Sequence, residues 1–418
     1  MSETRDESIT PYDRLNWTDQ ELENLLASGE RRRELIAVFG SELYGELAAL
    51  AQAASARAAE HGSRVWLGPG IMGSRLGRSR TGGAPPDTLW LDPIDIIAGR
   101  LTELTMRSND QVRSLGIVHF SYLKLKLQLA AAGYAVRCFD YDWRCGIADL
   151  GQLFAAVLRA DGRDCMVVAH SMGGLVARAA LTHIGLPHWT RLLLIGTPNK
   201  GSWATVQALR GTYSVVRRLA QLDRQHDAQA LASLTFHSFQ SLYDLLPGVA
   251  NADTAMLHPD AWPREGLQPD RLCLQRAQLA TQDLLPGDAR SICIAGYGEP
   301  TALGASRAEE FTYEVGLEGD GTVACAAAGF SGAACYFARS SHGMLTRDDG
   351  IAAAVIELLQ TGATRLLPDT APAAGARWQV SDAQLRALPH PRVDWASMSI
   401  EERRLFLDSL NQPLPLPT

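Results

Sequence analysis

From residue 64 onward the sequence alternates between short apolar runs and longer amphipathic segments of helical period. This alternation constrains the fold more than any other feature, because strands that alternate with helices form right-handed crossovers and a parallel sheet covered on both faces. Helices are predicted between several of the runs, at 122–132, 150–159 and 175–184. The predicted strands are Val65–Leu67, Ala135–Phe139, Met166–Ala169, Leu192–Ile195, Ile292–Ala295 and Ala334–Ala338.

Three parts follow one another along the 418 residues. Residues 1–63 form a predicted helical extension that either binds a partner or packs on the main domain. Residues 64–362 form the predicted α/β domain, and the alternation stops at about 201–289, where so long an insertion predicts a helical cap or lid. Residues 363–418 form a predicted linker and helical tail, with capping signatures at Ser381 and Ser399.

The charge balance argues against a nucleic-acid partner. With 39 basic and 46 acidic residues, the net charge is −7, whereas a dedicated nucleic-acid-binding protein needs a basic surplus to neutralise phosphates. The first 17 residues are polar, no apolar run is long enough to cross a membrane, and no pair of the seven cysteines is spaced C-x-x-C. We therefore expect a cytoplasmic protein, with peripheral membrane contact as an alternative; the oligomeric state stays open.

One motif predicts a nucleophile. The segment Ala169-His170-Ser171-Met172-Gly173 follows an apolar strand and leads into a helix, which is the strand–turn–helix context of a nucleophile elbow. The residues two before and two after the serine must be small at such a turn, and here they are alanine and glycine. We expect the side chain of His170 to point away from the nucleophile and to be structural.

A serine nucleophile needs a base, and the base needs an orienting acid. In this architecture the acid and then the histidine follow the serine along the chain. Asp320 lies in a glycine-flanked loop, and His342 comes just after the last predicted strand, so both are expected at the carboxyl edge of the sheet. Asp140 and Asp142 remain less favoured alternatives for the acid.

Two backbone N–H groups are expected to bind the oxyanion. One belongs to Met172, directly after the nucleophile, and the other to Ile71 in the glycine-rich loop that follows the first strand. The side chains of Met72, Trp143 and Leu245 are candidates for the substrate pocket, with ordinary core packing as the alternative.

Seven short blocks in one order resemble the lecithin:cholesterol acyltransferase family, which includes lysosomal phospholipases and phospholipid:diacylglycerol acyltransferases. The resemblance covers about residues 64–362. It implies an α/β-hydrolase fold with a cap, and a serine-linked acyl intermediate formed from a glycerolipid ester. The triad positions of the family match Ser171, Asp320 and His342. The blocks are Gly68–Ser74, Tyr141–Arg144, Ala169–Gly173, Gly196–Pro198, Leu245–Pro247, Gly319–Val323 and Ser341–Gly343.

These observations together predict a serine hydrolase acting on lipid-like carboxylic esters, with no metal or organic cofactor. Hydrolysis is preferred because water needs no dedicated acceptor site. One alternative is an O-acyltransferase that moves the acyl group to a lipid alcohol. A second alternative is a non-catalytic α/β-hydrolase scaffold used as a binding module. We expect a lipid or other ester as substrate, and transient contact of the lid with a membrane surface remains open.

Overall fold

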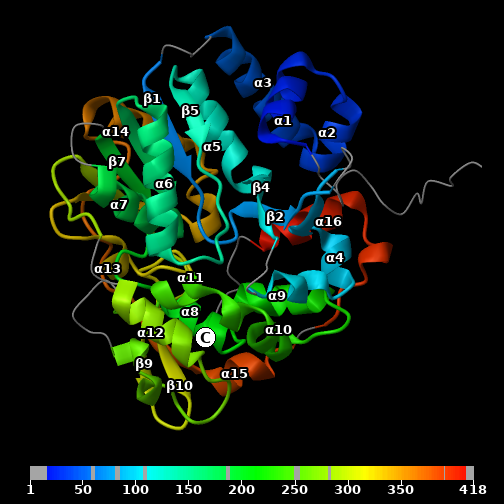
Figure 1. Cartoon of the computed structure of the whole chain (residues 1–418), viewed down its shortest axis with the longest axis vertical. Coiled ribbons are helices and arrows are strands. Elements are labelled where there is room, and N and C mark those ends of the chain that lie inside the picture. The colour runs from blue at the N-terminus through cyan, green and yellow to red at the C-terminus, as the bar shows by residue number, and fades with distance from the viewer. Residues whose placement is uncertain are drawn as a thin grey trace, which may run out of the picture.

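A six-stranded parallel sheet forms the centre of the molecule in the computed structural model (Figure 1). The structure describes residues 17–57, 62–80, 85–106, 111–184, 189–248, 255–280, 284–389 and 391–410. The strand order is β11-β8-β7-β6-β1-β5, and each strand overlaps one of the six predicted strands. The strands are β1 (Arg64–Gly68), β5 (Ala135–Cys138), β6 (Cys165–His170), β7 (Trp189–Ile195), β8 (Ser291–Tyr297) and β11 (Ala334–Arg339).

Helices cover both faces of this sheet, because alternate side chains of each strand point to opposite faces. On β6, for example, Val167 belongs to the apolar cluster beneath α6 and α7, whereas Val168 belongs to the cluster beneath α5 and α14. The four helices are α5 (His119–Ala131), α6 (Ile147–Asp161), α7 (Met172–Ile184) and α14 (Asp349–Thr361). Because all the strands are parallel, their carboxyl ends lie at one edge, where a site is expected.

Two small antiparallel sheets accompany the central sheet, and the sequence analysis predicted neither. Along the chain, the strands of one sheet come between β1 and α5. The other sheet consists of a hairpin that follows β8 and of one strand from the C-terminal segment. The predicted helical tail therefore also contains a strand, β12. The strands are β2 (Ser74–Arg78), β3 (Asp87–Trp90) and β4 (Arg113–Ile117) in the first sheet, and β9 (Thr301–Arg307), β10 (Phe311–Gly316) and β12 (Trp378–Ser381) in the second.

The described residues 17–57 of the N-terminal segment are helical. Its helices are α1 (Asp19–Ser28), α2 (Arg32–Phe39) and α3 (Ser41–Ala56), and α1 begins at a capping box formed by Thr18 and Glu21. Buried leucines of α1 and α2 join the same apolar cluster as α6 and α7, so these described helices pack on the main body rather than project from it. Figure 1 shows them (blue) beside α5.

Helices also fill the predicted insertion between β7 and β8, and we call this segment the cap. They are α8 (Trp203–Leu209), α9 (Ser214–Leu222), α10 (Ala228–Leu234), α11 (Gln240–Asp244) and α12 (Arg271–Ala280). Tyr243 and Leu246 are fully buried, so the cap has an apolar interior of its own. Two further short helices, α4 (Pro93–Ile97) and α13 (Cys325–Ala328), lie outside the cap.

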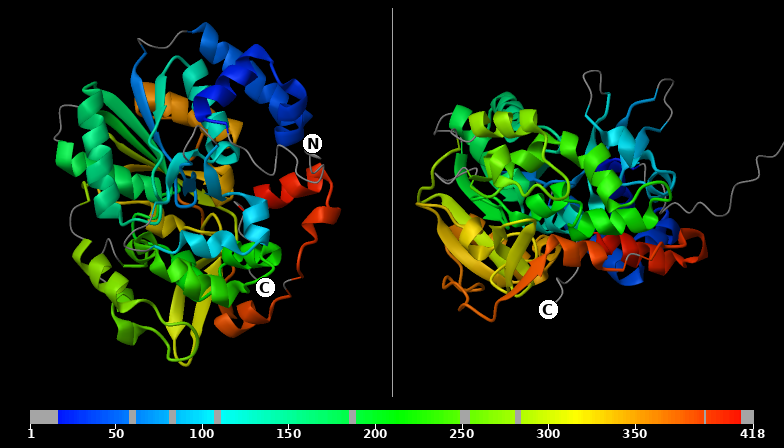
Figure 2. Two further views of the ribbon diagram at one scale, coloured as in Figure 1. Left: turned by 45° about the vertical axis from the view of Figure 1, so that its right-hand side comes forward. Right: turned by 90° about the horizontal axis from the view of Figure 1, so that it is seen from below.

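The C-terminal segment runs along the outside of the molecule, past the cap, to the N-terminal helices (Figure 2). Its helices α15 (Asp382–Ala387) and α16 (Ile400–Ser409) begin at the predicted positions, because Ser381 and Ser399 each form a capping box. Both helices therefore start where the sequence says they should, and their apolar residues Leu385 and Leu407 are buried.

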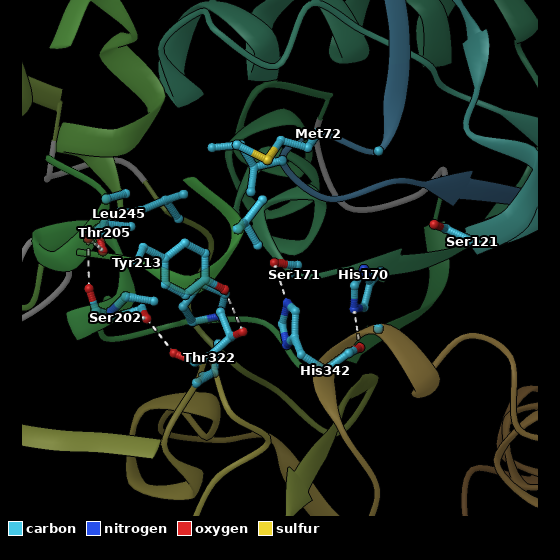
Figure 3. A pocket seen from close by; sticks show the side chains of 18 of the residues that line it. Met72, Ser121, His170, Ser171, Ser202, Thr205, Tyr213, Leu245, Thr322 and His342 are labelled. Atoms are coloured by element: carbon cyan, nitrogen blue, oxygen red, sulfur yellow. Dashed lines mark hydrogen bonds between the residues drawn. The ribbon is translucent and has the colours of Figure 1, made fainter. Parts of the chain in front are cut away.

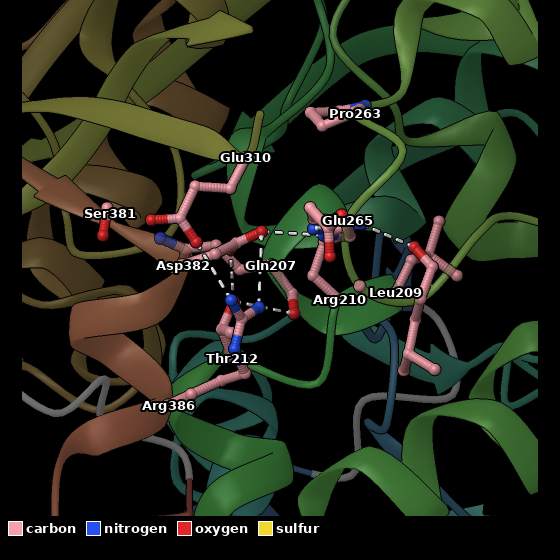
Figure 4. Close-up of polar contacts among 12 residues, drawn as sticks. Gln207, Leu209, Arg210, Thr212, Pro263, Glu265, Glu310, Ser381, Asp382 and Arg386 are labelled. Atoms are coloured by element: carbon pink, nitrogen blue, oxygen red, sulfur yellow. Dashed lines mark hydrogen bonds and ion pairs between the residues drawn. The ribbon is translucent and has the colours of Figure 1, made fainter. Parts of the chain in front are cut away.

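A buried ion pair fastens the cap to this C-terminal segment (Figure 4). Arg210, at the end of α8, contacts Asp382 at 2.7 Å, and both side chains are 0% exposed. The guanidinium also donates to the carbonyls of Glu265 and Leu267, while the carboxylate accepts from the hydroxyls of Thr212 and Tyr313. Because every charged group has several partners, the pair is held in one geometry despite its burial.

Replacement of Asp382 by alanine is expected to lower the free energy of unfolding by about 3–5 kcal/mol, because it leaves the buried Arg210 guanidinium without its counterion. Urea denaturation measures this loss. The matched control is Glu310→Ala, which breaks a partly exposed pair with Arg386 and should cost less than about 1 kcal/mol. Equal losses in the two variants would contradict the argument.

Candidate active site

Ser171 lies on a strained turn between β6 and α7. Its φ angle is +53°, a region that residues other than glycine rarely adopt and that is associated with functional sites. The Ser171 N–H donates to the carbonyl of Ile195 at the end of the adjacent strand β7. The turn is therefore fixed at the carboxyl edge of the sheet, in the strand–turn–helix context that the sequence predicted.

Close backbone approach explains the small residues around Ser171. A Cβ atom at Gly173 would lie 2.3 Å from the carbonyl oxygen of Pro69, so no larger residue fits without moving the loop after β1. Ala169 is tolerated at the other small position because its partner in register on β1 is Gly68. Ala169 and Gly173 thus both allow the turn at Ser171 to pack closely against the end of β1 and the loop that follows it.

Asp320 reaches the sheet edge by a longer route than predicted. It does not directly follow β8, because the β9–β10 hairpin lies between them, and the chain then returns beside the end of β8 through a bridge between Glu299 and Asp320. The carboxylate is fully buried, and its Oδ1 accepts the backbone N–H groups of Thr322 and Val323 at 3.0 and 2.7 Å. These donors fix the orientation of the carboxylate and compensate its burial.

His342 connects Asp320 to Ser171, and Figure 3 shows its ring beside the hydroxyl of Ser171. Its Nδ1 lies 2.7 Å from Oδ2 of Asp320, and its Nε2 lies 2.9 Å from Oγ of Ser171. In this geometry the carboxylate selects the tautomer with the proton on Nδ1, so that Nε2 is free to accept the hydroxyl proton of the serine. The three predicted residues are thus within hydrogen-bonding distance in the required order.

The loop after β1 forms a tight turn against Ser171. The Gly73 N–H donates to the Gly70 carbonyl, and Met72 has a φ of +60°. A Cβ atom on Gly70 would lie 2.7 Å from the Cβ of Ser171, so glycine permits this approach. Within the described part of the chain, the N–H groups of Ile71 and Met172 have no acceptor. Two unpaired donors beside a serine are what an oxyanion requires.

His170 contacts the backbone at His342 rather than the hydroxyl of Ser171. The Gly70 N–H donates to the Tyr122 hydroxyl, which lies 2.9 Å from Nδ1 of His170, and Nε2 of His170 lies 3.1 Å from the His342 carbonyl. Nε2 must carry a proton to donate to the carbonyl, and in the neutral ring Nδ1 then accepts the hydroxyl of Tyr122. This chain of hydrogen bonds therefore links the turn at Gly70 to the His342 loop through a neutral imidazole.

A cavity of about 110 Å³ opens at Ser171 and His342. Of the predicted pocket residues, Met72 and Leu245 line it, as does Ile71 (Figure 3). The other apolar lining residues are Pro198, Ala204, Ala208, Val215, Leu242, Val323 and Leu410. Most of these apolar lining residues belong to the cap. Among the described residues, the lining contains histidine and several hydroxyl side chains but no carboxylate, lysine or arginine side chain.

Trp143 lies elsewhere, which corrects the expectation that it lines the pocket. Its side chain is fully buried, donates through Nε1 to the Ser74 carbonyl at 2.9 Å, and packs edge-on against Trp90 and Phe239. The segment after β5 turns this indole inward, so that it fastens β2 rather than contacting the cavity. The alternative of core packing is therefore correct for Trp143.

Two side chains of the cap form hydrogen bonds with the loop that carries Asp320. Ser202 donates its hydroxyl to the carbonyl of Thr322 at 2.5 Å, and the Tyr213 hydroxyl lies 3.0 Å from Oγ1 of Thr322. The N–H of the same Thr322 binds the carboxylate of Asp320. These contacts were not predicted from the sequence. The only local signal was the position of Thr322 two residues after an aspartate, which is typical of an Asx turn.

Neither competing carboxylate reaches this site. Asp140 accepts hydrogen bonds from the Ser114 hydroxyl and the Gly116 N–H, and Asp142 forms an ion pair with Arg144. Both are therefore occupied at the small β2–β3–β4 sheet. Within the described residues, no group of three or more His, Cys, Asp or Glu side chains could hold a metal ion. None of the described helices is long and apolar enough to cross a membrane.

Comparison with known proteins gives one family match and several structural neighbours. The family described as "PGAP1-like alpha/beta domain" matches residues 146–244, which include Ser171 and part of the cap but neither Asp320 nor His342. No curated protein matches the sequence. The parallel sheet, its flanking helices and the turn at Ser171 are those of an α/β-hydrolase fold, as predicted.

The structural neighbours include the Bacillus licheniformis lipase BlEst2 in its propeptide form (TM-score 0.38, 16% identity), covering 72% of this chain and 51% of that one. Its mature form has a TM-score of 0.35 at 16% identity and covers 72% and 92%. The Tle4–Tli4 complex has a TM-score of 0.42 at 13% identity and covers 56% and 75%. This chain thus spans about half the length of the lipase in its propeptide form.

Burial and the neighbouring His342 hold the pKa of His170 well below its usual value of 6.5. The folded protein therefore keeps His170 neutral, whereas the unfolded chain takes up a proton below about pH 6.5, so His170 makes stability fall as the pH drops through that value. The variant His170→Gln has no titratable group at this position, so this contribution should vanish. Below pH 6.5, the slope of the unfolding free energy against pH should therefore decrease by up to about 1.4 kcal/mol per pH unit. Urea titrations between pH 5 and 8 measure the slope; identical slopes for variant and wild type would refute the argument.

Proposed function

We propose that this protein is a serine hydrolase that cleaves carboxylic esters of lipids through an acyl-enzyme intermediate. The observation that carries the proposal is the continuous chain of hydrogen bonds from Asp320 through His342 to Ser171, which ends in a mostly apolar cavity. A serine hydroxyl is a weak nucleophile at neutral pH, and an oriented imidazole is the group that activates it.

In the proposed reaction, Oγ of Ser171 attacks the ester carbonyl while Nε2 of His342 takes its proton. Asp320 stabilises the imidazolium, and the N–H groups of Ile71 and Met172 bind the negative oxygen of the tetrahedral intermediate. Collapse of the intermediate breaks the ester C–O bond, and His342 gives the proton to the departing alcohol. Water, activated by the same imidazole, then releases the acid and restores the free serine. None of these steps uses a metal or an organic cofactor.

The chemistry of the cavity supports a lipid ester rather than a charged substrate. Its described lining combines aliphatic side chains with neutral hydroxyl groups, such as those of Thr205 and Tyr213, and offers no ionic partner for a phosphate or a carboxylate. An acyl chain can replace water along such a wall, and each methylene group buried there contributes about 0.8 kcal/mol. The narrower relationship that we propose, to the lecithin:cholesterol acyltransferase family, rests on the seven sequence blocks.

Replacement of Ser171 by alanine should abolish ester hydrolysis, with a loss of at least about 10³-fold in kcat, because the nucleophile is removed while the backbone of the turn is kept. Turnover of a p-nitrophenyl ester and labelling by a fluorophosphonate probe measure the effect. The matched control is Ser233→Ala, which alters an exposed serine of α10. Wild-type turnover in Ser171→Ala, or a wild type that the probe fails to label, would contradict the proposal.

The proposed contact with a lipid surface is supported by two exposed leucines of the cap. Leu272 and Leu279 are 55% and 83% exposed and lie two turns apart on α12, so they share one face of the helix. Arg271 and Arg276 are also exposed on this helix and can approach anionic head groups.

Replacing both leucines by aspartate should weaken sedimentation with vesicles of mixed neutral and anionic phospholipid at least tenfold, because two apolar contacts are lost and like charges face the lipid. Hydrolysis of a water-soluble short-chain ester should stay unchanged, since α12 contributes no residue to the cavity. The control is Gln275→Asp, which adds one charge to the same helix and removes no apolar group. Equal sedimentation of the double variant and the wild type would exclude this surface.

A further inference from the structure

We propose that Leu410, at the end of the C-terminal helix α16, sets the length of acyl chain that the cavity accepts. This inference rests on the proposed ester hydrolysis and assigns a specificity-determining residue to it. Leu410 lines the same cavity as Ser171 and His342, although it belongs neither to the central sheet nor to the cap. Most of the remaining apolar wall comes from the cap and from the turn at Ile71 and Met72.

The end of α16 is held in place from two directions. Arg218 of the cap helix α9 donates a hydrogen bond to the Ser409 carbonyl, and Arg347, which follows the His342 loop, forms an ion pair with Asp408. Arginine suits this position because its guanidinium can satisfy a carbonyl that the helix end leaves without a partner. The residue after Ser409 is therefore fixed against the cavity by the cap on one side and by the His342 segment on the other.

Leu410 itself is packed rather than loosely placed. Only 5% of its surface is exposed, its N–H donates to the Leu407 carbonyl at 3.1 Å, and Leu407 is equally buried. A side chain anchored in this way presents a fixed boundary to anything that enters the cavity. By contrast, Leu405 of the same helix is 57% exposed and lines no part of the cavity, so it offers a matched control.

The size of the cavity makes this boundary important. Its volume of about 110 Å³ is well below the roughly 300 Å³ at which typical ligand pockets begin. Such a space accepts the ester group and a short aliphatic segment, so every additional methylene must displace part of the wall. Leu410 is an apolar part of that wall that belongs to neither the cap nor the central sheet and forms no hydrogen bond with Ser171.

The test compares kcat/KM for p-nitrophenyl butyrate, octanoate and decanoate in the full-length wild type, Leu410→Ala, Leu410→Trp and Leu405→Ala. One methylene in a hydrophobic pocket changes kcat/KM by roughly tenfold or more. Leu410→Ala should therefore raise the octanoate-to-butyrate ratio about tenfold. Leu410→Trp should lower the ratio by a similar factor, and Leu405→Ala should keep the wild-type ratio. Because the two substitutions at Leu410 act in opposite directions, a folding defect in one leaves the other informative.

Labelling of each variant by a fluorophosphonate probe distinguishes a failure of the proposed role of Leu410 from a failure of the proposed hydrolysis. Normal labelling of Ser171 together with the same chain-length ratio in all four proteins would overturn the role of Leu410 and leave the proposed hydrolysis intact. A wild type that neither reacts with the probe nor cleaves any of the three esters would overturn the hydrolysis, and the role of Leu410 with it. Opposite shifts in Leu410→Ala and Leu410→Trp support the inference.

Discussion

The candidate site depends on the close backbone approach between the turn at Ser171 and the loop after β1. The positive φ of Ser171 would be unfavourable by itself, and it is maintained because Gly173 and Gly70 let two chain segments meet without side chains between them. The same contact brings the turn that contains Ile71 against the serine. One steric requirement, met by two glycines, thus positions both the proposed nucleophile and the proposed oxyanion donors.

The central sheet and the three polar residues of the site could be predicted from the sequence because their signals are local. Six apolar runs gave six strands, and parallel strands end at one edge, which is why residues as distant as Ser171, Asp320 and His342 were expected together. The β9–β10 hairpin was missed although it pairs two neighbouring segments. β12 was missed because it pairs with β10, a segment far away in the chain, and because so short a strand carries little periodicity. No motif marks such a partner.

The direction in which a side chain points was the second feature that could not be predicted from the sequence. Trp143 was expected in the pocket from its place in a motif, but only the path of the chain after β5 decides that its indole faces the interior. The chain of hydrogen bonds from Tyr122 through His170 to the His342 carbonyl likewise joins three separate elements. Leu410 carries no local signal at all, because its role depends on where α16 is anchored. Local sequence patterns therefore predict candidate catalytic residues, whereas the residues that line a cavity are determined by tertiary packing.

The buried pair of Arg210 and Asp382 has a consequence for the order in which the protein can be assembled during synthesis. Arg210 leaves the ribosome well before Asp382, and during that interval its guanidinium has no counterion for a buried position. Arg210 gains this counterion only after the chain beyond β11 has emerged and docked. The wall of the cavity, which includes Leu410, is likewise complete only once α16 has docked.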